Sequence, residues 1–193
     1  MLSRLLMSAL TLPHLFCGWG YSIPARQFTV TISIPTTAPS VGADYGWEMA
    51  EINGTTFTQI GFVWFATGTD YVVNGEPVPI GQPYLFAYTA DGQCNGDNLG
   101  QCGTYTLGTA LQPGSNLTVD IAHSGDWYGT EAMLNATWQM VAQTNLTGTP
   151  VWQTYSETYG PMVPITFSNI QYYNNGWFSL PGGNTNAIAP ISN

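Results

Sequence analysis

Apolar and polar residues alternate with a period of two along much of this chain. The clearest runs are residues 28–34, 117–121 and 134–140, in which every second residue is apolar. Successive side chains of a β-strand point to opposite faces, so each run gives a strand with one apolar and one polar face. Clusters of Gly, Pro, Asn and Asp separate the runs, and no stretch has a helical period of useful length. The sequence therefore predicts an all-β chain folded as an antiparallel β-sandwich of the jelly-roll or concanavalin-like kind.

A single domain is expected, because the chain has 193 residues and shows no boundary or internal repeat. The predicted sandwich spans residues 26–180. Four further runs rich in aromatic and β-branched residues complete the expected strands: 57–65, 83–88, 151–159 and 165–173. Residues 181–193 are small and polar and are expected to form a C-terminal tail.

Residues 1–20 have the composition of a secretory signal peptide. Arg4 supplies a positive charge, residues 5–16 are largely apolar, and small residues follow them. We expect cleavage between residues 17 and 25, and therefore a secreted, extracellular protein. The apolar run is too short to cross a bilayer and no second run approaches the length of about 18 residues that would, so no membrane anchor is expected. A buried N-terminal helix is the alternative.

Cysteine usage agrees with export to an oxidising compartment. Cys17 would leave with the signal peptide, and Cys94 and Cys102 would then form a disulfide worth about 2–3 kcal/mol on the chain-entropy model. Two free thiols or half of a metal site are the alternatives, but the chain lacks the further Cys and His residues that a zinc site needs. Sequons for N-glycosylation are also compatible with secretion and occur at Asn53, Asn116, Asn135 and Asn145.

The scarcity of cations excludes several partners and reactions. The chain has 2 Lys+Arg against 11 Asp+Glu, and none of the two cations is a lysine. Such a chain cannot neutralise a nucleic-acid backbone or an anionic membrane. The mature protein would keep one imidazole, His123, with no free thiol, no glycine-flanked serine elbow, no zinc-binding helix motif and no phosphate loop. No metal or cofactor is therefore predicted, and any catalysis would use carboxylates, amides and phenols.

Two of the expected strands carry candidate catalytic residues. In residues 57–65, Gln59 shares a face with Gly61, which leaves room for another chain to approach. In residues 151–160, Glu157 shares a face with Tyr155 and Tyr159, a partly apolar setting able to raise the pKa of a carboxyl group toward that of a general acid or base. A solvent-facing glutamine and an ordinary surface carboxylate are the simpler interpretations.

The order of motifs resembles the neprosin-type domain of secreted plant proteins, which is similar to the fungal glutamic peptidases. The similarity covers about residues 44–175, and residues 84–115 carry its most specific part. The matching segments are Trp47 to Gly54, Gln59 to Phe62, Tyr84 to Gly92, Cys94 and Cys102, Leu107-Gly108, Pro113 to Ser115, Asp126 to Tyr128 and Glu157 to Gly160.

This resemblance implies a secreted peptidase with a β-sandwich fold and a catalytic pair that faces across a cleft on the concave sheet. Gln59 matches the first catalytic position and Glu157 the second, which is the glutamine form of the pair. Trp47 matches a cleft-lining tryptophan, with Tyr155 and Tyr159 on the substrate side. Glu157 would act as general base toward water and Gln59 would stabilise the oxyanion of a polypeptide substrate, at acidic pH and without a cofactor.

Two other functions stay open from the sequence. The aromatic residues of a catalytically silent sandwich would suit a glycan- or surface-binding protein. A polysaccharide-cleaving enzyme would need a second carboxylate near Glu157, for which Glu131, Glu48 and Glu51 are the candidates.

Overall fold

The computed structural model describes thirteen stretches of the chain. They are residues 14–21, 25–38, 44–53, 56–65, 72–73, 76–77, 80–90, 103–124, 127–134, 137–145, 151–159, 165–184 and 191–192. Throughout these stretches the regular elements are strands, every described strand pair is antiparallel, and no helix occurs that could span a membrane. The predicted all-β, antiparallel sandwich is confirmed.

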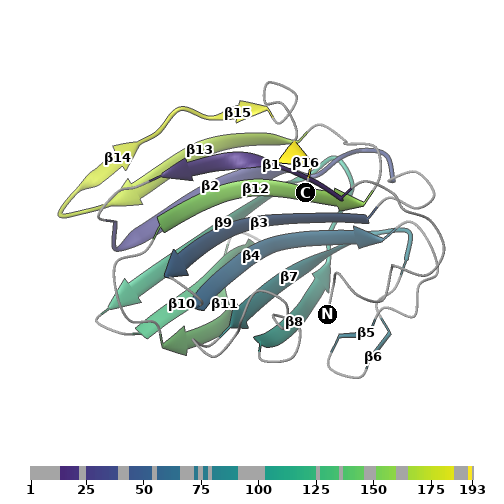
Figure 1. Ribbon diagram of the computed structural model, residues 1–193, viewed down its shortest axis with the longest axis horizontal. Helices are drawn as coiled ribbons and strands as arrows, with labels where there is room; N and C mark the ends of the chain where they lie inside the picture. Colours follow the sequence, from purple (N-terminus) through teal and green to yellow (C-terminus); the bar gives the residue numbers. More distant parts are fainter. Residues whose placement is uncertain are drawn as a thin grey trace.

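One sheet, which we call sheet A, has seven strands. Their spatial order is β16 (Ile191–Ser192), β1 (His14–Tyr21), β12 (Val151–Tyr159), β3 (Asp44–Asn53), β4 (Thr56–Phe65), β7 (Pro83–Ala90) and β8 (Gly103–Ala110). Strand β3 therefore lies between β4, its neighbour in sequence, and β12, which follows it by about a hundred residues (Figure 1).

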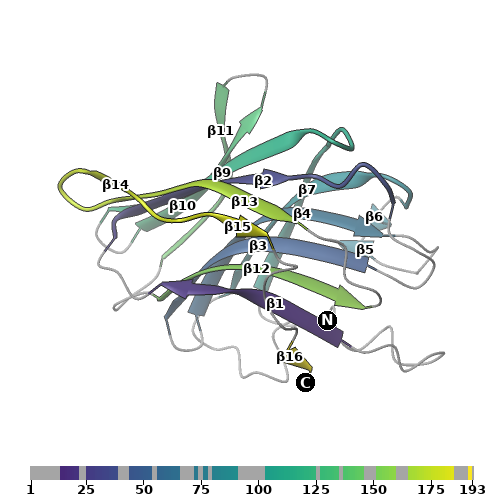
Figure 2. The ribbon, with the colours of Figure 1, turned by 90° about the horizontal axis from the view of Figure 1, so that it is seen from above.

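The second sheet, sheet B, also has seven strands. Their order is β11 (Thr137–Asn145), β10 (Trp127–Leu134), β9 (Asn116–Ser124), β2 (Gln27–Ser33), β13 (Thr166–Tyr173) and β14 (Trp177–Ser179), with β15 (Gly183–Asn184) paired to β13. Figure 2 shows the sheets as layers, with β2, β9 and β13 in one and β1, β12 and β3 in the other. A separate hairpin pairs β5 (Val72–Val73) with β6 (Glu76–Pro77).

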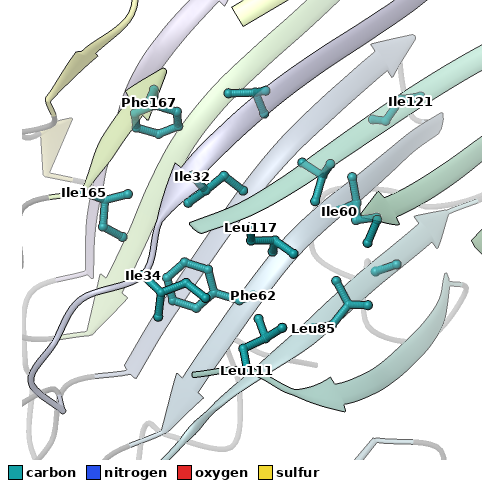
Figure 3. Close-up of a cluster of buried hydrophobic side chains, with 14 of the residues drawn as sticks. Ile32, Ile34, Ile60, Phe62, Leu85, Leu111, Leu117, Ile121, Ile165 and Phe167 are labelled. Carbon is teal, nitrogen blue, oxygen red and sulfur yellow. The ribbon is translucent and has the colours of Figure 1, made fainter. Parts of the chain in front are cut away.

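The hydrophobic core lies between the two sheets, on the apolar faces that the alternation predicts. Phe28, Val30 and Ile32 of β2 are 0% exposed, and Ile60 and Phe62 of β4 reach the same cluster from sheet A. Figure 3 shows Ile32, Ile60 and Phe62 of this cluster, together with other buried side chains. Full burial of one such side chain stabilises the fold by about 1.5–3 kcal/mol. Burial therefore determines which face of each strand packs against the core.

The N-terminal strand overlaps the predicted signal peptide. Strand β1 pairs with β12 over its whole length, from His14 opposite Tyr159 to Tyr21 opposite Trp152. Residues 14–21 are a strand and not a helix, and the earlier part of the segment lies outside the described residues. The signal peptide stays a prediction, and cleavage between residues 17 and 25 would remove much of β1 and turn β12 into an edge strand.

The predicted C-terminal tail takes part in both sheets. Within residues 181–193, β15 pairs with β13 of sheet B, and β16 pairs with β1 of sheet A. The start of the tail is tightly placed, since a Cβ added at Gly182 would lie 2.3 Å from the carbonyl oxygen of Phe167. Residues 180–182 therefore lie directly against the β13 backbone, which explains the requirement for glycine there.

We expect the substitution Gly182→Ala to destabilise the fold by about 1–3 kcal/mol, because the backbone of β13 must move to admit a methyl group. Gly176→Ala is the matched control, since a Cβ there would meet only the Phe178 ring at 3.8 Å. Urea unfolding of both variants measures the difference. Equal midpoints for the two variants would contradict the close packing at Gly182.

Candidate active site

Gln59 and Glu157 lie on one face of sheet A, as the sequence analysis requires of a catalytic pair. Along β4, Ile60 and Phe62 face the core, so Gln59 belongs to the opposite, outer face. Glu157 of β12 is opposite Gly46 of β3, and Gly46 is opposite Val63 of β4, which shares the outer face with Gln59. The outer face of sheet A therefore holds both candidates.

The register nevertheless places Gln59 and Glu157 at different positions along the strand direction. Gln59 is opposite Ala50, and Ala50 is opposite Gln153, so position 153 of β12 is level with Gln59. Glu157 lies four residues further along, and β3 separates it from β4. With about 3.3 Å per residue and about 4.8 Å between strands, the α-carbons of Gln59 and Glu157 are about 16 Å apart. A peptide bond that reacts with both residues must therefore lie over β3, between these two positions.

Glu48 is the carboxylate position between the two candidates. It is opposite Gly61 of β4 and opposite Tyr155 of β12. Gln59 and Glu157 are its diagonal neighbours, one on each flanking strand, and diagonal neighbours in a sheet lie about 7–8 Å apart. We call the diagonal of Glu157, Glu48 and Gln59 the outer-face triad. The other suggested partners of Glu157 lie elsewhere: Glu51 is on the inner face of β3, and Glu131 is in sheet B.

Trp47, for which the family resemblance implies a cleft-lining role, lies on β3 next to Glu48, and that role stays a prediction. Trp47 is opposite Phe62, which is 0% exposed and belongs to the core between the sheets. Position 47 is therefore on the inner face of sheet A, whereas Gln59 and Glu157 are on the outer face. Positions 155 and 159 share the outer face with position 157, and Tyr155 is directly opposite Glu48. The contact of Tyr155 and Tyr159 with a substrate stays a prediction.

A buried apolar surface borders the outer-face triad. Val63 and Phe65 of β4 are 2% exposed and Phe86 of β7 is 1% exposed, although all three lie on the outer face. The amide of Gly81 donates a hydrogen bond of 3.0 Å to the carbonyl oxygen of Phe65, which brings the chain back to the end of β4. This part of the outer face is therefore not exposed to solvent.

The remaining predicted sites fall at strand ends or outside the described residues. Asn116 begins β9 and is exposed, as a glycosylation site must be, and Asn53 and Asn145 end β3 and β11. Cys94, Cys102 and Asn135 lie outside the described residues, so the disulfide and the modification of these sequons stay predictions. Among the residues that the structure describes, no group of three His, Cys, Asp or Glu could hold a metal ion.

Sheet B carries a polar cluster that the sequence analysis missed. Asp120 lies on the outer face of β9, yet it is only 1% exposed. The side-chain amide of Gln27 donates to both carboxylate oxygens at 3.1 Å, and the hydroxyl of Thr29 donates to one of them. One row away, Thr31 and Thr118 share a hydrogen bond of 3.0 Å. Since Gln27 precedes Asp120 by 93 residues, only the tertiary pairing of β2 with β9 reveals this cluster.

The hydrogen bonds of this cluster predict that two substitutions in β9 will lower the free energy of unfolding by different amounts. Asp120→Ala leaves the Gln27 and Thr29 donors without their acceptor, and hydrogen bonds to a charged group are worth about 1.5–3 kcal/mol each. Thr118→Ala removes one neutral hydrogen bond, worth about 1 kcal/mol. Chemical unfolding of both variants compares them, and a Thr118→Ala variant that loses more stability than Asp120→Ala would contradict the assignment.

Comparison by sequence finds neither a matching protein family nor a matching curated protein. Comparison by structure finds glutamic peptidases. Scytalido-glutamic peptidase in complex with a transition state analog inhibitor has a TM-score of 0.56 and 13% identity, over 86% of this chain and 83% of that one. The same enzyme with a peptide-based transition state analog has a TM-score of 0.54 and 9% identity, over 87% of each chain.

A third similar structure is SCP-B, a member of the eqolisin family of peptidases, in complex with the tripeptide Ala-Ile-His. Its TM-score is 0.52 and its identity 10%, over 87% of each chain. These similarities show that the chain has a glutamic-peptidase-like fold. They confirm that part of the resemblance found in the sequence, whereas the neprosin-type assignment stays a prediction.

Proposed function

We propose that this protein is an acid-acting endopeptidase of the glutamic type, which hydrolyses polypeptides on the outer face of sheet A. The observation that carries the proposal is the position of Gln59 and Glu157 on one face of one sheet, in a fold similar to that of glutamic peptidases. The motif order of the sequence supports the same assignment. The identity to these peptidases is low, so the proposal depends on the chemistry of this chain's own residues.

The reaction needs one carboxylate, one amide and water. Glu157 takes a proton from the water whose oxygen attacks the carbonyl carbon of the peptide bond, and it returns that proton to the amine as the C–N bond breaks. The side-chain N–H of Gln59 donates a hydrogen bond to the oxygen that becomes negative in the tetrahedral intermediate. Tyr155 and Tyr159 lie on the same face and contact the substrate. No metal or cofactor is needed.

The charge of the chain is also compatible with activity at acidic pH. The formal net charge is −9, and it arises from 11 carboxylic residues against two cations. Protonation at low pH reduces the mutual repulsion among these carboxylates. We propose that the protein is secreted and works outside the cell, with Cys94 and Cys102 joined as a disulfide.

The substitutions Glu157→Gln and Gln59→Ala test this function. We expect Glu157→Gln to lower kcat by about 10²–10⁴-fold, because general base catalysis is lost. Gln59→Ala should lower kcat by about 10²–10³-fold, the usual effect of removing an oxyanion donor. Cleavage of an unfolded protein between about pH 2 and pH 7 measures both.

Glu76→Gln is the matched control for charge, because Glu76 is in the separate β5–β6 hairpin. It should keep the wild-type rate. Undiminished cleavage by Glu157→Gln would exclude Glu157 as the base, and a wild-type protein that cleaves nothing over this pH range would exclude the peptidase function.

Carbohydrate binding is the second candidate, and one observation on sheet B favours it. Trp177 of β14 is 52% exposed, and its ring packs edge-on against Tyr173 at 5.5 Å between centroids. Register places both residues on the face that carries Gln27 and Asp120. An exposed aromatic ring presents the kind of flat apolar surface on which a sugar ring stacks.

Pull-down with insoluble polysaccharides tests this alternative. If sheet B binds glycans, we expect Trp177→Ala to lose retention by at least tenfold, while Ile80→Ala, which alters an exposed side chain before β7, should be retained as the wild type is. Wild-type protein that no polysaccharide retains would exclude this function.

A further inference from the structure

The outer face of sheet B carries a set of polar and aromatic side chains at the edge that ends in β14, the strand next to β13 (Figure 1). Two rows of residues cross β2, β13 and β14 there. Gln27 is opposite Tyr173, which is opposite Trp177, and Thr29 is opposite Gln171, which is opposite Ser179. We call these six residues the sheet-B platform. Their neighbours Phe28 and Tyr172 belong to the core or pack against it, so the platform faces away from the core.

Trp177 gives the platform an open apolar surface. Its side chain is 52% exposed, and its ring lies 5.5 Å from that of Tyr173, measured between centroids, with an interplanar angle of 61°. In an edge-on contact of this kind, the neighbouring ring covers at most one face of the indole. At least one face of Trp177 is therefore not covered by Tyr173, and a flat apolar group of a ligand can stack on it.

Asp120 orients the amide of Gln27 at the other end of the same row. The Nε2 atom of Gln27 lies 3.1 Å from both carboxylate oxygens of Asp120. An ionised carboxylate only accepts hydrogen bonds, so the donor end of the amide points to Asp120 and the Oε1 atom points away from it. Asp120 is itself only 1% exposed, so a ligand on the platform meets the amide oxygen of Gln27 and not the carboxylate.

The charge and the dimensions of the platform indicate the chemistry of its ligand. None of its six side chains is charged at neutral or acidic pH, which favours a neutral ligand over an ionic one. The row from Gln27 to Trp177 spans two strand spacings, or about 10 Å, which is the length of two linked sugar rings. Gln171 and Ser179 are exposed and lie about 7 Å further along the strands, where they border this row with groups that donate and accept hydrogen bonds.

We propose that the sheet-B platform binds a neutral β-linked glucan, with two neighbouring sugar rings across β2, β13 and β14. This inference rests on the carbohydrate binding that is the second candidate function, and it names the site and the sugar. A glucose ring with equatorial hydroxyls has C–H groups on both faces, and one face stacks on Trp177. Its hydroxyls lie around the rim, where Gln171 and Ser179 bind them. The next ring lies over Tyr173 and donates a hydroxyl hydrogen bond to Oε1 of Gln27.

Substitutions of exposed residues test this site. The measurement is equilibrium binding to insoluble cellulose and to curdlan, two neutral β-glucans of different linkage. We expect Gln171→Ala to weaken binding by about three- to tenfold, because a hydrogen bond to the sugar is lost. Trp177→Phe keeps an aromatic face and should stay within about threefold of the wild type, unlike Trp177→Ala.

Trp138→Ala is the matched control for the loss of an exposed tryptophan. Trp138 is 40% exposed but lies on β11, at the opposite edge of sheet B, so its removal should leave binding unchanged. We also expect about 0.5 M sodium chloride to leave binding unchanged, since salt screens interactions between charges and the platform has none.

Several results would overturn the inference and leave carbohydrate binding standing. They are retention of the wild type by an anionic polysaccharide only, wild-type binding by both Gln171→Ala and Trp177→Ala, and an equal loss of binding in Trp138→Ala and Trp177→Ala. Wild-type protein that no polysaccharide retains would exclude the inference and carbohydrate binding together. A dimer in sedimentation that Trp177→Ala converts to a monomer would show that a second copy covers the platform, and would also overturn the inference.

Discussion

Packing of two apolar sheet faces against each other is the constraint on which the rest of this structure depends. Phe28, Val30 and Ile32 of sheet B and Ile60 and Phe62 of sheet A are all 0% exposed. Because side chains alternate along a strand, this burial fixes which residues face outward as well. A shift by one residue in β4 would exchange Ile60 and Gln59 between the core and the outer face. The core therefore determines the candidate site, although none of its residues belongs to that site.

The outer faces of the two sheets differ in their polar groups. Sheet A presents the diagonal of Glu157, Glu48 and Gln59 beside a buried apolar surface. Sheet B presents Asp120, which donors from β2 hold in place, and an exposed tryptophan at its edge. The similarity to glutamic peptidases concerns the fold, so the proposed assignment of chemistry to sheet A depends on these particular residues.

The alternation of the sequence was sufficient to predict the sandwich. It also indicated which residues of each strand share a face with Gln59 and with Glu157. It could not predict that β12 lies beside β3, because that pairing joins segments far apart in the sequence and depends on the whole sheet. Without the pairing, the offset of the two candidates and the intermediate position of Glu48 are invisible. The face of sheet A to which Trp47 belongs could not be predicted either. The segment from Trp47 to Ile52 mixes apolar and charged residues, so its period did not indicate which face meets the core. The burial of Asp120 was equally beyond prediction, since its partner Gln27 comes from a different strand.

The central claim is that polypeptides bind and react on the outer face of sheet A, and the most direct measurement is the location of a bound reaction mimic. A crystal structure with a peptide that carries a tetrahedral phosphinate in place of the scissile bond would show it. The account predicts that the phosphinate lies over β3, with its oxygens within hydrogen-bonding distance of Gln59 and Glu157. A phosphinate bound on sheet B, or on sheet A away from β12, β3 and β4, would contradict the account.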